Sequence, residues 1–235
     1  APEWARANNA LPAGERLAHL VVTQFTDAFD ASVEGPDAPP DAWRDWLGTR
    51  HPLPVLEGGQ CHAWTDALAC ADAPPVLAVG PADLALLPYT SGTTGLPKGC
   101  MHLHSSIMHN AVASSLWGNG SADNVTLAVV PMFHITGMVS VMHAAIYGGA
   151  TLVVMPRWDR DLAGRLISRW QVTNWTNIPT MVIDLLGSPN FASFDLSSLA
   201  YIGGGGAAMP QPVAQRLLEQ YGLRYAEGYG LTETA

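Results

Sequence analysis

The sequence contains little positive charge, and arginine carries almost all of it. The 11 basic residues are ten arginines and one lysine, Lys98, against 20 acidic residues, so the formal net charge is -9. A chain this acidic lacks the electrostatic attraction that nucleic acids and anionic membrane surfaces exert on basic proteins. We therefore expect neither as a partner.

Cysteines, charged residues and long apolar runs are also scarce. The three cysteines, Cys61, Cys70 and Cys100, have neither the even number nor the paired spacing of a disulfide framework or zinc site. No apolar run is long enough to span a bilayer and no basic leader precedes one, so we expect a cytoplasmic protein with reduced thiols. Hydrophobic residues make up 48% and charged residues 13% of the chain, which predicts a folded apolar core.

The single lysine lies in the most distinctive stretch of the chain, residues 88–99, which read PYTSGTTGLPKG. Glycines let a backbone approach a ligand closely, and successive N–H groups in such a turn form an anion-binding concavity. Hydroxyls and an ammonium add further donors. The stretch therefore predicts a phosphate-binding loop, although a solvated turn would use similar residues. The residues concerned are Thr90, Ser91, Gly92, Thr93, Thr94, Gly95 and Lys98.

This loop differs from the phosphate loop of the common nucleoside triphosphatases. That loop requires a glycine before its lysine and a serine or threonine after it, opening a helix. Here Pro97 precedes Lys98 and Gly99 follows it, and residues 100–104 favour a strand. The apolar residues 83–89 before the loop predict a buried strand.

From residue 83 onward, expected strands and helices alternate. Strands are expected at 125–130, 151–155, 172–178, 199–202 and 223–226, and helices at 105–117, 137–147, 160–170, 180–186 and 211–221. Such alternation predicts an α/β fold with a mainly parallel sheet and helices on both faces. Ligands in such folds bind beyond the carboxyl ends of the strands, where four glycine-rich or polar stretches are expected to converge. Residues 1–82 are expected to form a less complete portion with a Pro/Gly-rich excursion, a strand at 17–23 and helices at 41–47 and 64–70.

Residues 89–99 resemble the signature loop of the adenylate-forming superfamily, which includes acyl-CoA synthetases, adenylation domains of peptide synthetases and beetle luciferases. Three further stretches follow in that family's order: residues 131–138 (PMFHITGM), 203–210 (GGGGAAMP) and 227–235 (EGYGLTETA). The resemblance implies an acyl-CoA-synthetase-like N-terminal domain over residues 83–235. Because the chain lacks a starting methionine and stops within a motif, we expect a piece of a larger enzyme without its C-terminal lid domain.

The resemblance also implies roles for individual residues. It implies that Tyr229 stacks on adenine, Thr232 contacts the α-phosphate, and Glu233 with Thr90 holds Mg²⁺. His134 is expected beside the carboxylate being activated, and Lys98 on the phosphates. The remaining nucleotide contacts implied are Gly205, Gly206, Ala207, Glu227, Gly228 and Gly230.

The implied reaction uses ATP, Mg²⁺ and coenzyme A to convert a carboxylic acid into an acyl adenylate and then a thioester. The family has a second lysine on its mobile C-terminal domain, and Lys98 is the only lysine here, so the chain alone is expected to turn over slowly. Apolar walls expected near Met138, Met142, Trp175, Thr176 and Met181 favour a fatty or aryl acid. Exposed apolar surface would favour homo-oligomers. Two alternatives stay open: an adenylation domain that loads a carrier protein, and a nucleotide-binding module without catalysis.

Overall fold

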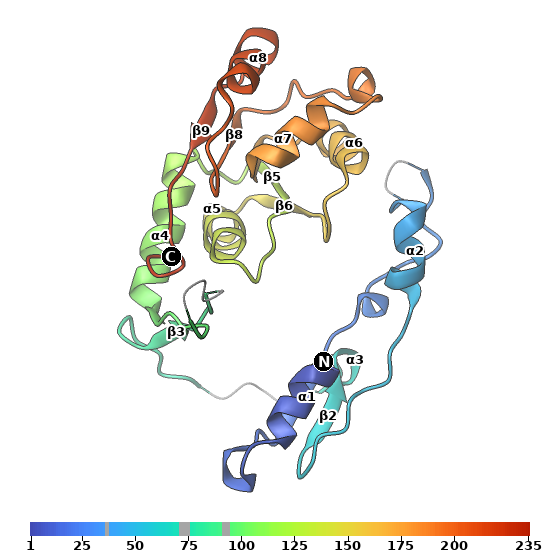
Figure 1. Cartoon of the computed structure of the whole chain (residues 1–235), viewed down its shortest axis with the longest axis vertical. Helices are drawn as coiled ribbons and strands as arrows, with labels where there is room; N and C mark the ends of the chain where they lie inside the picture. Colours follow the sequence, from blue (N-terminus) through green and yellow to red (C-terminus); the bar gives the residue numbers. More distant parts are fainter. Residues whose placement is uncertain (36–37, 71–75, 91–94) are drawn as a thin grey trace. The chain divides into compact units, whose positions relative to one another are not determined.

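The structure, a computed structural model, describes residues 1–35, 38–70, 76–90 and 95–235 (Figure 1). It divides into two compact units, Ala1–Leu77 and Ala78–Ala235. We call them unit 1 and unit 2 and describe each by itself. None of the described helices is both long and apolar enough to cross a membrane.

Unit 1 contains a parallel pair of strands, β1 and β2, with register His19 opposite Gln60. Of its elements, the strand β1 and the helices α2 and α3 were expected from sequence, whereas α1 and β2 were not. The elements of unit 1 are α1 (Pro2–Asn9), η1 (Ala13–Glu15), β1 (His19–Val22), η2 (Phe25–Asp27), α2 (Asp41–Gly48), β2 (Gln60–Ala63) and α3 (Trp64–Leu68).

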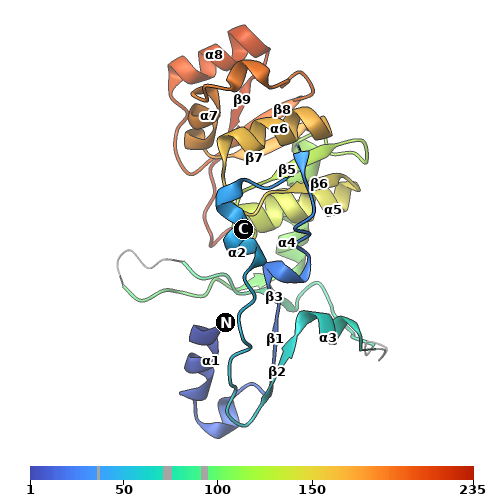
Figure 2. The same ribbon diagram turned by 90° about the vertical axis from the view of Figure 1, so that its right-hand side faces the viewer.

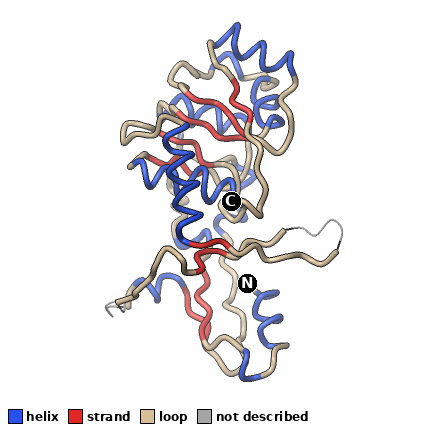
Figure 3. The backbone as a smooth tube through the Cα atoms, turned by 90° about the vertical axis from the view of Figure 1, so that its left-hand side faces the viewer, coloured by secondary structure: helices blue, strands red, loops and turns tan. Residues whose placement is uncertain are grey.

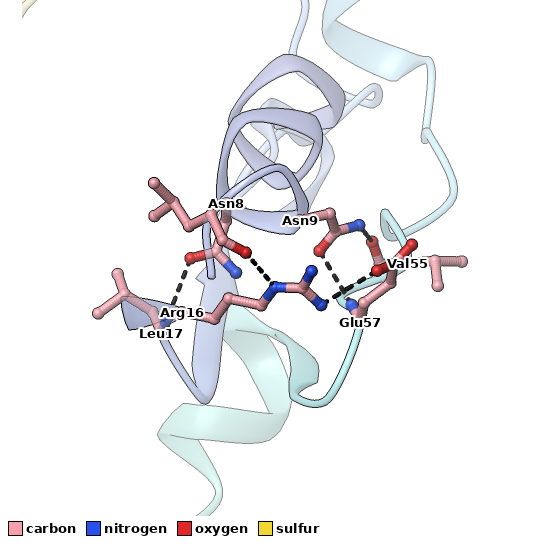
Figure 4. Close-up of polar contacts among 7 residues, drawn as sticks. Asn8, Asn9, Arg16, Leu17, Val55 and Glu57 are labelled. Atoms are coloured by element: carbon pink, nitrogen blue, oxygen red, sulfur yellow. Dashed lines mark hydrogen bonds and ion pairs between the residues drawn. The ribbon is translucent and has the colours of Figure 1, made fainter. Parts of the chain in front are cut away.

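Two asparagines at the end of α1 hold that helix to both strand segments (Figure 4). The Asn8 side-chain oxygen accepts the Leu17 N–H at 2.9 Å, at the entrance to β1. The Asn9 side chain accepts the Glu57 N–H at 2.9 Å and donates to the Val55 carbonyl at 3.1 Å, just before β2. These bonds satisfy backbone groups that the short parallel pair leaves unpaired.

The amphipathic helix expected at 41–47 is confirmed as α2. Trp43 and Leu47 are buried, and Trp46 packs edge-on against Phe25 of η2 with ring centroids 4.8 Å apart. Trp43 is therefore a core residue and Trp46 packs half-buried beside it, on the face that the 3.6-residue spacing predicts.

Unit 2 is built around a five-stranded sheet in the order β6-β5-β7-β8-β9, and every neighbouring pair in it is parallel. Helices separate these strands along the chain, so the predicted α/β architecture is confirmed (Figure 2). The elements of unit 2 are β3 (Leu84–Leu86), β4 (His102–Leu103), α4 (His104–Trp117), β5 (Val125–Ala128), η4 (Thr136–His143), α5 (Ala144–Gly148), β6 (Thr151–Val154), α6 (Arg160–Trp170), β7 (Asn174–Asn177), α7 (Pro179–Leu186), η5 (Phe191–Ser193), β8 (Tyr201–Gly204), α8 (Gln211–Tyr221) and β9 (Tyr225–Glu227).

The strand before the glycine-rich loop is not part of this sheet, which corrects the sequence-based prediction. β3 pairs antiparallel with β4 in a separate two-stranded sheet, and Leu84 is 47% exposed. The pairing continues into the loop, where Tyr89 bridges Gly99 and the Thr90 N–H donates to the Lys98 carbonyl at 3.0 Å. Residues 84–90 and 95–103 therefore form the two arms of a hairpin, and these arms extend away from the five-stranded sheet (Figure 3).

Opposite faces of the central strand β7 meet different helices, because successive side chains of a strand point to opposite sides. Trp175 is 1% exposed and stacks on Trp158 at 5.8 Å. The Trp158 indole in turn donates to Asp184 of α7 at 2.8 Å. Thr176 lies on the other face, where it lines a cavity together with residues of η4 and α5. The sheet thus has helices on both faces, as predicted.

The helix expected at 137–147 begins with an unusual segment. Its first part, η4, has the wider hydrogen-bonding pattern of a π-helix and passes directly into α5. π-helical segments are rare and are found frequently at functional sites. Here the segment follows the His134 loop immediately, and Val139 and Val141 within it are fully buried.

Candidate functional site

Three of the four sequence motifs line one cleft in unit 2. Residues 131–138 follow β5, residues 203–210 include the end of β8, and residues 227–235 include the end of β9. The carboxyl ends of parallel strands meet at one edge of a sheet, which is why these loops converge. The cleft has a volume of about 880 Å³ and lies between that edge, the sheet face toward η4, and the helices α4 and α5.

The glycine run of β8 is tightly packed and is not slack chain. A Cβ on Gly204 would lie 1.7 Å from the Asn177 carbonyl oxygen of β7, and one on Gly205 would lie 2.4 Å from the Gly228 carbonyl oxygen. The backbones of β7, β8 and the β9 loop therefore approach closely only because side chains are absent. Gly205 and Gly206 line the cleft as expected, whereas the exposed Ala207 does not.

The loop after β9 is anchored at its start and open at its aromatic residue. The Glu227 carboxylate accepts the Met209 N–H at 2.7 Å, and the Gly228 N–H donates to the Gly204 carbonyl at 2.7 Å. Tyr229 is 91% exposed at the cleft, so its ring face is available to a planar guest. Gly230, Thr232 and Glu233 also line the cleft, with the Glu233 side chain exposed.

His134 lies in the same cleft, directly after β5 and before η4. Its Nδ1 accepts the Thr136 N–H at 3.2 Å, which leaves Nε2 as the ring nitrogen free for a guest. The exposed Phe133 ring lies beside it. His134, which is expected beside the carboxylate of the acid, thus lies at the edge of the sheet where the three motifs meet.

The hairpin residues are placed differently. Among the described hairpin residues, Thr90, Gly95 and Lys98 do not line the cleft, so the structure does not bring them to the other three motifs. The Lys98 side chain is exposed, and the Thr90 hydroxyl accepts the Lys98 N–H at 3.4 Å. Ser91, Gly92, Thr93 and Thr94 lie outside the described residues.

The base of the hairpin nevertheless contacts the terminal motif. His102 of β4 is 4% exposed, and its Nε2 lies 2.7 Å from the carbonyl oxygen of Thr232, so it donates there. Asn110 of α4 donates to the Thr234 carbonyl at 3.0 Å, and Ala235 packs with Leu86 of β3 against the α4–η4 cluster. The end of the terminal motif is therefore held by hydrogen bonds from β4 and from α4.

Most of the residues that the sequence suggests as apolar walls do not line the cleft. Of the five residues expected to form apolar walls, Thr176 lines the cleft. The other four, Met138, Met142, Trp175 and Met181, do not. Met138 packs on the α4–η4 cluster and Trp175 points to the opposite face of the sheet. The prediction was wrong because helix and strand faces were not assignable from composition alone.

Two tyrosines flank the end of β7 on opposite faces of the sheet. Tyr225 donates to the Asn177 side-chain oxygen at 3.0 Å, and burial, with the negative charge of Glu227, raises the pKa of Tyr225 to about 12. Tyr201 lines the cleft, and burial raises its pKa. Both phenols stay neutral at ordinary pH and can donate hydrogen bonds.

Sequence reasoning missed Tyr201, and it missed the partner of His102 although that histidine was expected to be structural. Tyr201 starts the strand that feeds the glycine run, so period-2 counting from Gly203 would have placed it on the same face. No local signal marks His102, because its partner is 130 residues away in the sequence. Within the described residues, no three His, Cys, Asp or Glu side chains form a group that could hold a metal ion.

Known proteins resemble this chain over most of its length. The profile of the AMP-binding enzyme family matches residues 4–235. A long-chain-fatty-acid–CoA ligase of Bacillus subtilis (strain 168) is 35% identical over 155 residues, covering 65% of this chain and 28% of that protein. A feruloyl-CoA synthase of Amycolatopsis sp is 35% identical over 167 residues, covering 71% of this chain and 34% of that protein. The match thus spans about a third of these relatives.

The fold comparison agrees with the sequence comparison. The inhibitor-bound N-terminal domain of FACL13 from Mycobacterium tuberculosis has a TM-score of 0.63 to this chain at 32% identity, covering 74% of this chain and 44% of that one. The predicted acyl-CoA-synthetase-like N-terminal domain is confirmed.

Proposed function

The chain belongs to the family of AMP-binding enzymes, and on that premise we propose that the protein activates a carboxylic acid with ATP and transfers the acyl group to coenzyme A. The observation that carries the proposal is the convergence of residues 131–138, 203–210 and 227–235 on one cleft of about 880 Å³. A volume of this size accommodates a nucleotide or a small acid. The names of the two relatives, both CoA-thioester-forming enzymes, support the same chemistry.

In the first half-reaction a carboxylate oxygen of the acid attacks the α-phosphorus of ATP. The bond from that phosphorus to the bridging oxygen breaks, and pyrophosphate leaves with the bonding electron pair. We assign Tyr229 to the adenine ring, Thr232 to the α-phosphate and His134 to the side of the reacting carboxylate. Catalysis of this kind rests on positioning and on neutralising phosphate charge.

In the second half-reaction the sulfur of coenzyme A attacks the acyl carbon, its proton is released, and AMP departs with the former carboxylate oxygen. The remaining glycines of the cleft, Gly205, Gly206, Gly228 and Gly230, would let the nucleotide approach the backbone. We assign the hairpin residues Thr90, Ser91, Gly92, Thr93, Thr94, Gly95 and Lys98 to the phosphates. The contacts of His102, Leu86 and Ala235 support this assignment, because they hold the base of the hairpin beside the terminal motif.

Residues at the cleft fit a magnesium ion that accompanies ATP. Magnesium prefers hard oxygen ligands and usually binds through one or two carboxylates together with substrate phosphates. Glu233 presents an exposed carboxylate at the cleft. We assign the hydroxyl of Thr90, which lies on the hairpin and does not line the cleft, as a second ligand. When bound, the ion would supply charge neutralisation on the phosphates.

We further propose that the 235-residue chain turns over slowly by itself. Its only lysine is assigned to the phosphates, and the second lysine used by the resembling enzymes has no counterpart in this sequence. Met138, Met142, Trp175 and Met181 do not line the cleft, but other apolar side chains do, among them Phe133, Ile135 and Val141. These side chains suit the fatty or aryl acid expected from sequence.

Calorimetric titration of the chain with ATP and Mg²⁺ tests the nucleotide site. We expect Lys98→Ala to weaken ATP binding about tenfold, because a charge-assisted hydrogen bond to phosphate contributes about 1.5–3 kcal/mol. Arg224→Ala is the matched control, since Arg224 is exposed and outside the cleft, so it removes the same charge elsewhere.

Equal affinity of the Lys98→Ala and Arg224→Ala chains would remove Lys98 from the phosphate site, and no binding by the unmodified chain would remove the site itself. Acid-dependent exchange of pyrophosphate into ATP separates an enzyme from a nucleotide-binding module. Dependence of thioester formation on coenzyme A or on a carrier protein separates the two enzymatic alternatives.

A further inference from the structure

We propose that the cleft selects an acid that carries a hydrogen-bonding group away from its carboxylate, such as a hydroxylated aryl acid, in preference to a plain fatty acid. The recognising groups are the hydroxyls of Tyr201 and Thr176 on the cleft face of the sheet. This inference rests on the proposed function and specifies its substrate class.

The phenol of Tyr201 reaches along β8 toward the motif loops. A Cβ placed on Gly203 would lie 2.8 Å from the Tyr201 hydroxyl oxygen, so that oxygen lies over Gly203. Side chains two residues apart on a strand share a face, which puts Tyr201 and Gly203 on the same side. Only the absence of a side chain at Gly203 leaves room for the phenol there.

Thr176 lies beside this hydroxyl on the neighbouring strand. Thr176 of β7 is the register partner of Gly203 of β8, so their Cα atoms are adjacent across the sheet. Neighbouring strands of a sheet lie about 4.7–4.9 Å apart, so Thr176 is next to the position over Gly203 where the Tyr201 hydroxyl lies. Thr176 and Tyr201 both line the cleft and both are partly buried.

Neither hydroxyl has a hydrogen-bond partner among the described residues, in contrast to the polar side chain next to them. Asn174, opposite Tyr201 in the register, accepts from Asn124 at 2.9 Å and donates to the Gly118 carbonyl at 3.1 Å. The satisfied amide belongs to the scaffold, whereas the two hydroxyls are available to a guest.

An apolar chain lying over these hydroxyls would cut them off from water without replacing their hydrogen bonds. Leaving a buried polar group unpaired disfavours binding, and a site built to bond a hydroxyl rejects the analogue that lacks it. The hydroxyls lie about two residues, roughly 7 Å, along β8 from Gly205 at the strand rise of about 3.3 Å per residue. A guest with its carboxylate at the motif loops would therefore place its distal group near them.

Calorimetric titration of the chain, with ATP and Mg²⁺ present, tests this proposal with three acids: cinnamic acid, its para-hydroxylated analogue and octanoic acid. We expect the hydroxylated acid to bind about tenfold more tightly than cinnamic acid and octanoic acid. Tyr201→Phe should reduce the ratio between the first two acids to near one, and Thr176→Val should reduce it in part.

Tyr147→Phe is the matched control, because Tyr147 is 52% exposed on α5 and does not line the cleft, and it should retain the tenfold ratio. A ratio near one in the unmodified chain, tighter binding of octanoic acid, or an unchanged ratio in Tyr201→Phe would each overturn the inference. If ATP still binds in those cases, the proposed function stands. Absence of binding by ATP and by every acid overturns both.

Discussion

Substituting alanine for Gly204 tests how closely the strands under the cleft are packed. The added Cβ would lie 1.7 Å from the Asn177 carbonyl oxygen, and backbone is not free to move aside as the end of a flexible side chain is. We expect Gly204→Ala to lower the free energy of unfolding of unit 2 by about 3 kcal/mol or more, because β7 and β8 must separate.

Gly230→Ala provides the control in urea unfolding experiments. Gly230 lines the same cleft, has no atom near its Cβ position and does not have a positive φ. The substitution should change the midpoint of unfolding little. Similar losses of unfolding free energy in the two variants would show that the close contact between Gly204 and Asn177 is not the cause of the destabilisation.

Among the elements, β4 connects the hairpin to the terminal motif through one side chain. We expect His102→Leu to increase amide hydrogen exchange in residues 231–235 roughly fivefold, the effect of losing one hydrogen bond of about 1 kcal/mol. The same substitution should also lower the affinity for ATP, since Thr232 and Glu233 are assigned to the nucleotide and its metal.

His102→Gln can still donate to the Thr232 carbonyl and should recover part of the protection. His109→Leu serves as the control, because His109 is exposed on α4 and does not line the large cleft. Mass spectrometry of the C-terminal peptide provides the exchange rates. Identical rates in His102→Leu and the unmodified chain would mean that other contacts, such as Asn110 to Thr234, hold the segment alone.

The elements of unit 2 differ in how far local sequence determines them. The helices α6 and α8 were predicted with the bounds that they have. The Asp159 side chain caps α6 by accepting the Leu162 N–H at 2.8 Å, and Gly222 ends α8 in a left-handed conformation. Signals of this kind lie within a few residues of the helix end, so a single sequence is enough to identify them.

The residues at 83–89 show where local sequence is insufficient. A short apolar run is equally compatible with a buried parallel strand and with an arm of an antiparallel hairpin, and its distant partners decide between them. The same limit applies to the cleft. Its glycine-rich loops carry sequence motifs, but Tyr201 and Thr176 become cleft residues only through the register of β7 and β8.

For the molecule as a whole, the division at residues 77 and 78 predicts two unfolding events. Each unit has a buried tryptophan, Trp43 in unit 1 and Trp175 in unit 2, which are 9% and 1% exposed. Urea unfolding should give a separate transition for each unit. Comparing the fluorescence of the Trp43→Phe and Trp175→Phe chains assigns each transition to its unit. Coincident transitions in both variants would show that the units unfold together.

Alkaline pH should affect these two transitions differently, because all six tyrosines, at positions 89, 147, 201, 221, 225 and 229, lie in unit 2. The folded-state pKa of Tyr225 is raised to about 12 from an ordinary value of 10.0, and that of Tyr201 is raised as well. Between these values the folded state keeps protons that the unfolded state loses. The resulting stability is fully present below pH 10 and is lost as the pH rises through about 12.

The urea midpoint of unit 2 should therefore fall above pH 10, while tyrosine ionisation leaves that of unit 1 unaffected. Tyr225→Phe should reduce the alkaline decline of unit 2, since it removes the phenol with the raised pKa. Tyr147→Phe, which removes an exposed phenol, should leave most of the decline in place. An equal decline in the Tyr225→Phe and unmodified chains would mean that burial of Tyr225 does not govern the alkaline limit of unit 2.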